Sequence, residues 1–241
     1  MLLPIAIPSY NRALVLLRRT LKFLHKNLYP SHLITIFVAD SEQFKIYQDA
    51  IPKNLYNEIV VGVKGLCEQR HFISSYYPQD TMIVQMDDDL KGFVGDKSLI
   101  EVIEMGHQLM TEQNAGVFSI MPNSDKRRLK DDYTTHLAHC IGSFFIVRND
   151  KRLLPTGTEL EDYERSVLSF IHYKSVIRYR GAGVDTDYGK TPGGLQEEGR
   201  YERIQAGVKR MIDTYPIYCI AIKKGDRPDV RLNHRCKPME T

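Results

Sequence analysis

Apolar residues follow two alternating patterns along the first half of the chain. Continuous apolar runs of about four to eight residues are typical of strands that are buried on both faces of a parallel sheet. Longer stretches with an apolar residue at every third or fourth position are typical of helices that cover such a sheet. This half therefore predicts strands at residues 3–8, 33–39, 58–63 and 81–86, and helices at residues 12–27, from residue 41 through Tyr47, and at residues 66–77. Asn11 is expected to cap the first helix.

The second half mixes the same patterns less regularly. No internal repeat or low-complexity linker divides the chain, so residues 1–241 are predicted to form a single α/β domain. We expect a Rossmann-type fold with a mixed, mostly parallel central sheet flanked by helices. Helices are expected at residues 98–113, 161–173 and 197–214, strands at 115–121, 139–147, 175–180 and 218–222, a Gly-rich loop at 181–194, and a basic tail at the end.

The composition narrows the class of protein. Of the 241 residues, 42% are hydrophobic and 26% are charged, which is typical of a globular protein and not of a disordered, fibrous or membrane protein. The apolar start is too short for a membrane span, is interrupted by Pro4, and lacks the features of a cleavable signal, so we expect a cytoplasmic protein. The four cysteines form no C-x-x-C pair, which argues against a disulfide framework or a structural zinc site.

The charge distribution permits a polyanionic partner without requiring one. The formal net charge is +3, and basic residues gather at positions 126–130 and 223–231. Such runs contact nucleic acid in some proteins and are plain solvated surface in most.

Three consecutive aspartates, Asp87, Asp88 and Asp89, directly follow the strand expected at 81–86. Their mutual repulsion is costly unless a positive charge lies among them, and a hard divalent cation such as Mg²⁺ or Mn²⁺ suits carboxylate oxygens. On an extended chain Asp87 and Asp89 would point to the same side and share one metal. The alternative is a solvated loop, or an acidic cap for the helix near Ser98.

Further polar residues end the neighbouring strands. Ligands of parallel sheets bind outside the carboxyl ends of the strands, where Pro8, Tyr10 and Arg12 would reach a base or a phosphate. Asp40 would accept a hydrogen bond from a uridine or ribose hydroxyl, with a helix cap as the alternative. His234 is a candidate third metal ligand, with an ordinary surface position as the alternative.

A second acidic cluster lies at residues 159–164, where a helix is expected to begin. Acidic residues are favoured there by the helix dipole, but the cluster holds more of them than capping needs. Asp162 or Glu161 would then be a general base for an attacking hydroxyl. In the Gly-rich loop, Lys190 would reach a diphosphate leaving group.

Together these residues resemble a GT-A glycosyltransferase. Asp87–Asp89 matches the Asp-x-Asp motif of that fold, and Glu161–Asp162 resembles the acidic pair that carries the catalytic base in inverting members. More narrowly, the chain is similar over nearly its whole length to the TET/JBP-associated glycosyltransferases of phages and kinetoplastids, which include the base J glucosyltransferase. The matching segments are residues 7–13, Lys64–Gly65 with Arg70, the three aspartates, residues 142–145, residues 161–166, Arg178–Tyr179, and Lys190 before Gly193–Gly194. The segment Glu68–His71 departs from the family's pattern of Arg followed by Asn.

The resemblance implies a function. It implies transfer of a sugar, often glucose from its uridine diphosphate, with Mn²⁺ or Mg²⁺, onto a 5-hydroxymethylpyrimidine in DNA, in the host cytoplasm if the protein is viral. Residues 1–90 would bind the nucleotide-sugar and residues 91–241 the acceptor. Lys64, Gly65, Arg70, Asp88 and Lys190 would contact the donor. The residues themselves leave open a glycan, lipid or protein acceptor, a nucleotidyltransferase, and a non-catalytic carbohydrate- or DNA-binding module.

Overall fold

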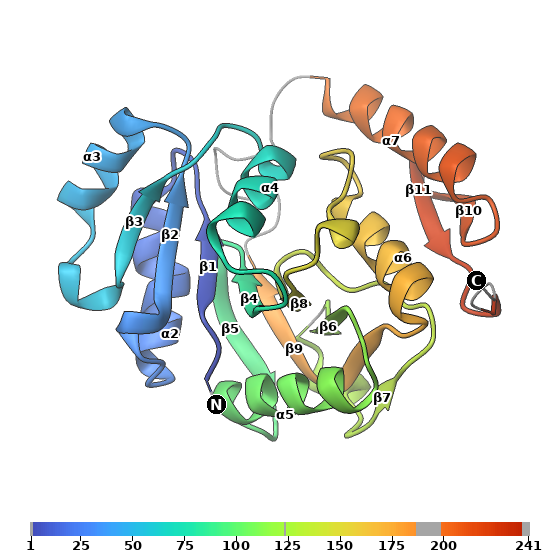
Figure 1. The fold of residues 1–241 in the computed structure, drawn as a ribbon, viewed down its shortest axis with the longest axis horizontal. Helices are drawn as coiled ribbons and strands as arrows, with labels where there is room; N and C mark the ends of the chain where they lie inside the picture. The colour runs from blue at the N-terminus through green and yellow to red at the C-terminus, as the bar shows by residue number, and fades with distance from the viewer. Residues whose placement is uncertain (1, 123, 187–198, 238–241) are drawn as a thin grey trace.

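The computed structural model describes residues 2–122, 124–186 and 199–237. In its first half, the strands that the apolar runs predict are present and parallel, and they lie in the order β3-β2-β1-β4 (Figure 1). Their bounds are β1 (Ile5–Pro8), β2 (Ile34–Val38), β3 (Glu58–Val61) and β4 (Met82–Met86). Between them run α3 (Ser41–Ala50) and α4 (Leu66–Tyr76).

The helix expected at residues 12–27 is present in three parts. These are α1 (Ala13–Leu16), the π-helical segment η1 (Leu17–Leu21) and α2 (Lys22–Lys26). The prediction that Asn11 caps this helix was wrong, because Arg12 occupies the N-cap position and no described side chain caps it. Asn11 instead has a left-handed backbone (φ 56°) and exchanges hydrogen bonds with the side chain of Gln43 on α3. Asn11 therefore bonds to a residue distant in sequence and not to the backbone of the helix that follows it.

The second half extends the sheet. Within the described residues nine strands form a mixed, mostly parallel sheet in the order β3-β2-β1-β4-β8-β6-β9-β5, with β7 also paired to β9, and helices cover it. Strands β8 and β5 run antiparallel to their neighbours. The remaining bounds are β5 (Leu90–Gly95), α5 (Leu99–Glu112), β6 (Val117–Met121), β7 (Tyr133–Thr134), β8 (Phe144–Arg148), α6 (Glu161–Tyr173), β9 (Ile177–Thr186), α7 (Arg200–Thr214), β10 (Cys219–Lys224) and β11 (Arg227–Leu232), with short 3₁₀ turns at Ser31–Leu33, Lys53–Leu55, Lys126–Arg128 and Lys151–Leu153.

Several elements differ from the expectation, among them the short strand β7, which was not predicted. Strand β5 was not predicted, and it pairs with the part of β9 where a Gly-rich loop was expected. The glycines there allow close packing: a Cβ on Gly181 would lie 2.1 Å from the Tyr179 hydroxyl. The basic tail forms β11, which pairs with β10 in a hairpin. The remainder of the predicted loop, with Lys190, and the first residues of the predicted helix at 197–214 lie outside the described residues.

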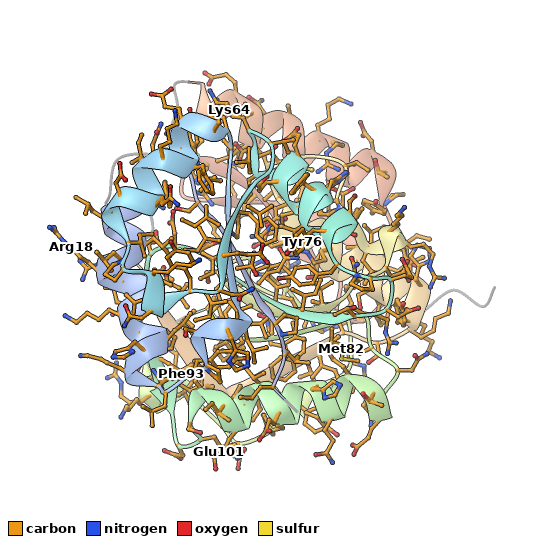
Figure 2. The ribbon with its side chains drawn as sticks, turned by 60° about the vertical axis from the view of Figure 1, so that its left-hand side comes forward. Arg18, Lys64, Tyr76, Met82, Phe93 and Glu101 are labelled. Atoms are coloured by element: carbon orange, nitrogen blue, oxygen red, sulfur yellow. The ribbon has the colours of Figure 1, made fainter. Side chains whose placement is uncertain are left out.

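Two hydrophobic clusters of the described residues cover the two faces of the sheet. Alternation along the strands separates them, because Ile5 and Ile7 belong to one cluster and Ala6 to the other. The first cluster includes residues of α1, α2, α3 and α5, and the second includes residues of α4, α6 and α7. Figure 2 shows α5, which carries Glu101, along one side, with Lys64 and Met82 toward opposite ends of the parallel strands. Among the described helices, none has both the length and the apolar character that a membrane crossing requires.

The packing of α5 predicts a stability change at Gly106. A Cβ at this position would lie 2.6 Å from Ile146 Cδ1 and 2.9 Å from Phe118 Cδ1, and both side chains are fully buried. Overpacking costs about 1–3 kcal/mol, which exceeds the roughly 1 kcal/mol that alanine gains over glycine in a helix. Gly106→Ala should therefore lower the free energy of unfolding measured in urea. Gly92→Ala is the control, since no described atom lies within 4 Å of its added Cβ; equal stability of the two variants would contradict this packing.

Candidate active site

The three aspartates form the connection between β4 and β5. Asp88 and Asp89 lie in a turn, so the extended chain that we assumed for this segment was wrong. Thr20 of the π-helical segment holds both ends of the turn: its hydroxyl donates to the Asp87 carbonyl (2.8 Å) and accepts from the Leu90 amide (3.0 Å). π-Helical segments are frequent at functional sites, and here the segment places a buried hydroxyl against the acidic turn.

Asp88 is buried and bound to the segment that follows β1. Its carboxylate accepts from the Ser9 hydroxyl (2.5 Å) and from Arg12 Nη1 (2.8 Å). Burial raises the pKa of Asp88 to about 6, although the charge of Arg12 and the Ser9 hydrogen bond oppose the rise. Arg12 also lies 3.5 Å from Asp89, so one guanidinium contacts two of the aspartates.

A chain of hydrogen bonds supports this contact from α3. The Ser9 hydroxyl gives its single proton to Asp88, so it must accept one from Tyr47 at 2.7 Å. The Tyr47 oxygen in turn accepts from the Arg12 backbone amide (3.0 Å). Burial raises the pKa of Tyr47 to about 12, so its hydroxyl stays protonated and able to donate.

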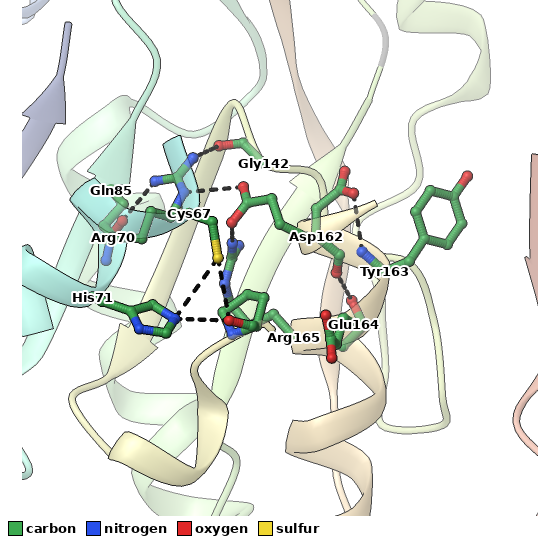
Figure 3. A network of polar contacts seen from close by, with 12 residues as sticks. Cys67, Arg70, His71, Gln85, Gly142, Asp162, Tyr163, Glu164 and Arg165 are labelled. Carbon is green, nitrogen blue, oxygen red and sulfur yellow. Dashed lines mark hydrogen bonds and ion pairs between the residues drawn. The ribbon is translucent and has the colours of Figure 1, made fainter. Parts of the chain in front are cut away.

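Arg70 lies behind the acidic turn and is buried. Its Nε donates to Glu161 (3.0 Å), Nη1 to Gln85 (2.6 Å) and Nη2 to the Gly142 carbonyl (3.2 Å) (Figure 3). The same Nη2 lies 3.6 Å from Asp87 Oδ1. Each guanidinium nitrogen thus contacts an oxygen of the protein itself. These contacts hold neighbouring parts of the site together and give no support to direct contact between Arg70 and a diphosphate.

Asp87 is the most exposed of the three aspartates, with 38% of its side chain accessible. Burial raises its pKa to about 8, and Asp89, Asp88 and Glu161 add to the rise against the opposing charge of Arg70. Two arginines, Arg12 and Arg70, thus face a turn that carries three aspartates.

A divalent cation fits this set of oxygen donors. Mg²⁺ in particular is commonly held by one or two carboxylates, with waters and substrate phosphates as the other ligands. Among the described residues, no group of three or more histidine, cysteine, aspartate and glutamate side chains forms a metal cluster. His234 follows β11 and is exposed, and no metal cluster among the described residues joins it to Asp87 and Asp89.

The acidic residues at the start of α6 each have a separate partner. No described side chain caps this helix, because the N-cap position is held by Leu160 with a left-handed backbone. Contacts with basic side chains instead explain why this segment holds more acids than capping needs. The pairs are Glu159 with Arg203, Glu161 with Arg70 and Arg165, Asp162 with His139, and Glu164 with Arg210. Glu161 is enclosed between two arginines, whereas 24% of the Asp162 side chain remains accessible. The geometry favours Asp162 over Glu161 as the group that meets a substrate.

His139 was missed by the sequence analysis. Its Nε2 lies 2.7 Å from Asp162 Oδ2, and its ring stacks on Tyr163 with a centroid distance of 3.9 Å. The residue fell inside a strand expected at 139–147, but β8 begins only at Phe144. No local pattern indicates the contact, since 23 positions separate the two side chains.

The other predicted donor-binding residues lie at the ends of the parallel strands. Asp40 caps α3 by accepting from the Gln43 amide (2.9 Å), the alternative considered for it. Pro8 is the buried last residue of β1. Lys64 Nζ lies 5.3 Å from the Tyr10 ring centroid, and Gly65 begins α4 with φ 103°, a backbone that favours glycine.

Comparison with known proteins identifies the fold. No family model matches the sequence, and no curated protein matches it. Several solved structures have a similar fold. The structure of GalNAc-T7 with UDP, GalNAc and Mn²⁺ covers 90% of this chain and 49% of its own chain, with a TM-score of 0.55 and 12% sequence identity. The present chain thus spans about half of GalNAc-T7.

Two further structures match over nearly their whole lengths. Glucosyl-3-phosphoglycerate synthase from Mycobacterium tuberculosis, in complex with Mn²⁺, UDP-glucose and phosphoglyceric acid, has a TM-score of 0.53 and 9% identity over 98% of this chain and 89% of that one. Mannosyl-3-phosphoglycerate synthase from Rubrobacter xylanophilus has a TM-score of 0.50 and 13% identity over 98% and 87%.

The chain has the GT-A fold. The mixed, mostly parallel sheet flanked by helices, expected from the sequence, is confirmed. The acidic turn lies at the carboxyl end of the parallel strand β4. Sheets of α/β proteins bind their ligands at this end of the strands.

The raised pKa of Asp87 predicts how stability depends on pH when metal is removed. A carboxyl whose pKa is higher in the folded than in the unfolded protein opposes folding once it ionises. For Asp87 this penalty is absent below about pH 4, grows with pH, and is complete above about 8. In EDTA, Asp87→Asn should therefore match the parent near pH 4 and unfold at higher urea concentration near pH 8.

Added Mn²⁺ should reverse this order near pH 8 by stabilising the parent more than the variant. Asp49→Asn, at an exposed position on α3, is the control. If the stability of the parent and of Asp87→Asn changed with pH in the same way, ionisation of Asp87 would not oppose folding.

Proposed function

We propose that the protein is a metal-dependent glycosyltransferase that moves a sugar, glucose in the simplest case, from a UDP-sugar onto a 5-hydroxymethylpyrimidine in DNA. The observation that carries this proposal is the turn of three aspartates, faced by two arginines, at the carboxyl end of β4 in a GT-A fold. The structurally similar proteins include complexes with UDP or UDP-glucose and Mn²⁺, which supports a nucleotide-sugar donor here.

The donor would lie across the ends of β1 to β4. Asp87 and Asp89 would hold Mn²⁺ or Mg²⁺, and the bound metal would supply positive charge opposite the donor diphosphate. Asp88, fixed by Ser9 and Arg12, would orient the ribose or a sugar hydroxyl. Tyr10 and Lys64 form a flat and charged surface at the same edge, suited to the base.

The acceptor would approach from the half that contains α6. Asp162 lies at the start of that helix with part of its carboxylate accessible, so it belongs to the acid–base machinery for the attacking hydroxyl. The segments shared with the TET/JBP-associated glycosyltransferases support a modified pyrimidine in DNA as the acceptor. Exposed basic residues support a polyanion, among them Lys126, Lys223 and Arg231.

The metal role of the acidic turn is tested by donor binding. Asp89→Ala should weaken UDP-glucose binding in Mn²⁺ by at least about 10-fold, the loss that already follows from removing an outer-shell partner of a metal ligand. In EDTA the parent and variant should bind the donor equally weakly. Calorimetry measures both, with Asp49→Ala as the control, and equal affinities in Mn²⁺ would remove the metal role. The products also discriminate: UDP marks a glycosyltransferase and pyrophosphate a nucleotidyltransferase.

The DNA acceptor is tested by modification and by salt. Duplex DNA that contains 5-hydroxymethylpyrimidine should gain a hexose by mass analysis, and plain DNA should not. Its affinity should fall by roughly 0.9 log units per log unit of salt for each phosphate neutralised, and Lys223→Glu should reduce that slope by about one phosphate.

Lys45→Glu, at an exposed position on α3, should leave the slope unchanged. Glycan or peptide hydroxyls that accept the sugar as well as modified DNA does would overturn the DNA assignment and leave the glycosyltransferase in place.

A further inference from the structure

His139 and Asp162 form a hydrogen-bonded pair on the acceptor side of the site. His139 lies in the segment before β8, and Asp162 is the second residue of α6. The ring stacks on Tyr163 at an interplanar angle of 13°, which fixes the plane of the imidazole. Two separate contacts therefore define where this side chain lies.

The pair is joined to the acidic turn by the short segment between His139 and β8. The Ser143 carbonyl accepts from the Asp87 amide (3.1 Å), and the Gly142 carbonyl accepts from Arg70. A Cβ on Gly142 would lie 3.6 Å from the Asp162 Cβ, and Figure 3 shows Asp162 beside this segment. The pair thus adjoins the edge that would bind the donor.

Asp162 by itself is poorly suited to remove a proton near neutral pH. Both of its oxygens already accept hydrogen bonds, Oδ2 from His139 and Oδ1 from the Tyr163 amide (3.0 Å). Burial would raise the pKa of Asp162, but His139 and Arg165 outweigh it and hold the pKa at about 2. A general base works best when its pKa is near the working pH.

The imidazole has the free position that the carboxylate lacks. With Nε2 directed to Asp162, no described residue is bonded to Nδ1. This nitrogen is also not among the buried polar atoms without a partner, and 24% of the side chain is accessible. Nδ1 is therefore open to solvent or to a substrate.

We propose that His139 is the general base of the transfer and that Asp162 orients it and stabilises its charged form. This inference rests on the proposed function. The acceptor hydroxyl gives its proton to Nδ1 while its oxygen bonds to the anomeric carbon. The bond from that carbon to the diphosphate oxygen breaks, and its electron pair leaves with UDP. The Asp162 carboxylate stabilises the imidazolium, as the aspartate does in other Asp–His pairs, and the proton is later released to solvent.

The charged groups around the pair come from several elements. On α6 these are Asp162, Glu161 and Arg165, with the Tyr163 phenol in the stack. Arg70 on α4 binds Glu161, and Arg178 on β9 lies near Cys140, the residue after His139. Carboxyl groups, guanidinium groups and phenols have ordinary pKa values outside the range from about pH 5 to 8, whereas that of histidine lies inside it.

The test measures UDP release from UDP-glucose with saturating Mn²⁺, with the hydroxymethylated duplex and, separately, with water as the only acceptor. His139→Gln should lower kcat for transfer by about 10²–10⁴-fold and leave the donor affinity measured by calorimetry unchanged. His25→Gln, at an exposed position on α2, is the control and should retain parental kcat. Because the two residues act as a unit, the double variant with Asp162→Asn should lose little more than the single one.

Two readouts separate catalysis from a structural role. At saturating donor and metal, the kcat of the parent should fall as the pH is lowered from about 8 to 5. Because Asp87 and Asp88 also have raised pKa values, the deciding readout is Asp162→Asn, which should move this fall to lower pH because the imidazolium loses its carboxylate partner. Added imidazole should restore transfer to His139→Gly and should not affect the parent.

Parental kcat in His139→Gln, or a parental kcat that stays constant down to about pH 4, would overturn the assignment of His139 and leave the glycosyltransferase intact. A parent that neither binds UDP-glucose nor releases UDP would overturn the proposed function, and this inference with it.

Discussion

The site is organised by the need to hold several carboxylates at one edge of a sheet. Asp87, Asp88 and Asp89 occupy a single short connection, and Glu161 lies close behind them. Like charges at such distances repel by about 1 kcal/mol per pair in water and by more when buried. Arg12 and Arg70 oppose this repulsion, while burial, together with the neighbouring carboxylates, raises the pKa of Asp87. A divalent cation would complete the balance.

The two arginines also connect the parts of the fold. Arg12 joins the end of β1 to the acidic turn, whereas Arg70 on α4 joins the turn to α6 through Glu161 and to the segment before β8 through Gly142. A buried charge without its partner costs several kcal/mol, so these contacts fix how the two halves meet. In the proposed function, the same ion pairs would set the distance between a donor at the strand ends and an acceptor at α6.

Neutral hydrogen bonds give the acidic turn its shape. Thr20 binds the backbone at both ends of the turn. The Tyr47 hydroxyl donates to Ser9, and the Ser9 hydroxyl donates to Asp88. At the start of α6 each acid has a different partner, so the segment is a set of separate contacts and not one acidic patch. Among the described ion-pair and hydrogen-bond partners of the acids of α6, the partner of Asp162 is a histidine, His139.

The sequence by itself determined the parallel strands and the placement of the three aspartates, because both depend on local patterns: apolar runs, and polar residues where those runs end. It also indicated Asp162, since acidic residues were in excess there. Tertiary structure alone decided that Asp88 is bound by Ser9 and Arg12, that Arg70 is buried against Glu161 and Gln85, and that His139 lies on Asp162. It also made residues 182–186 of the predicted Gly-rich loop part of β9, where they pair with β5. These contacts join residues far apart in the chain, and their energies depend on burial and on neighbouring charges, which no local pattern of residues records.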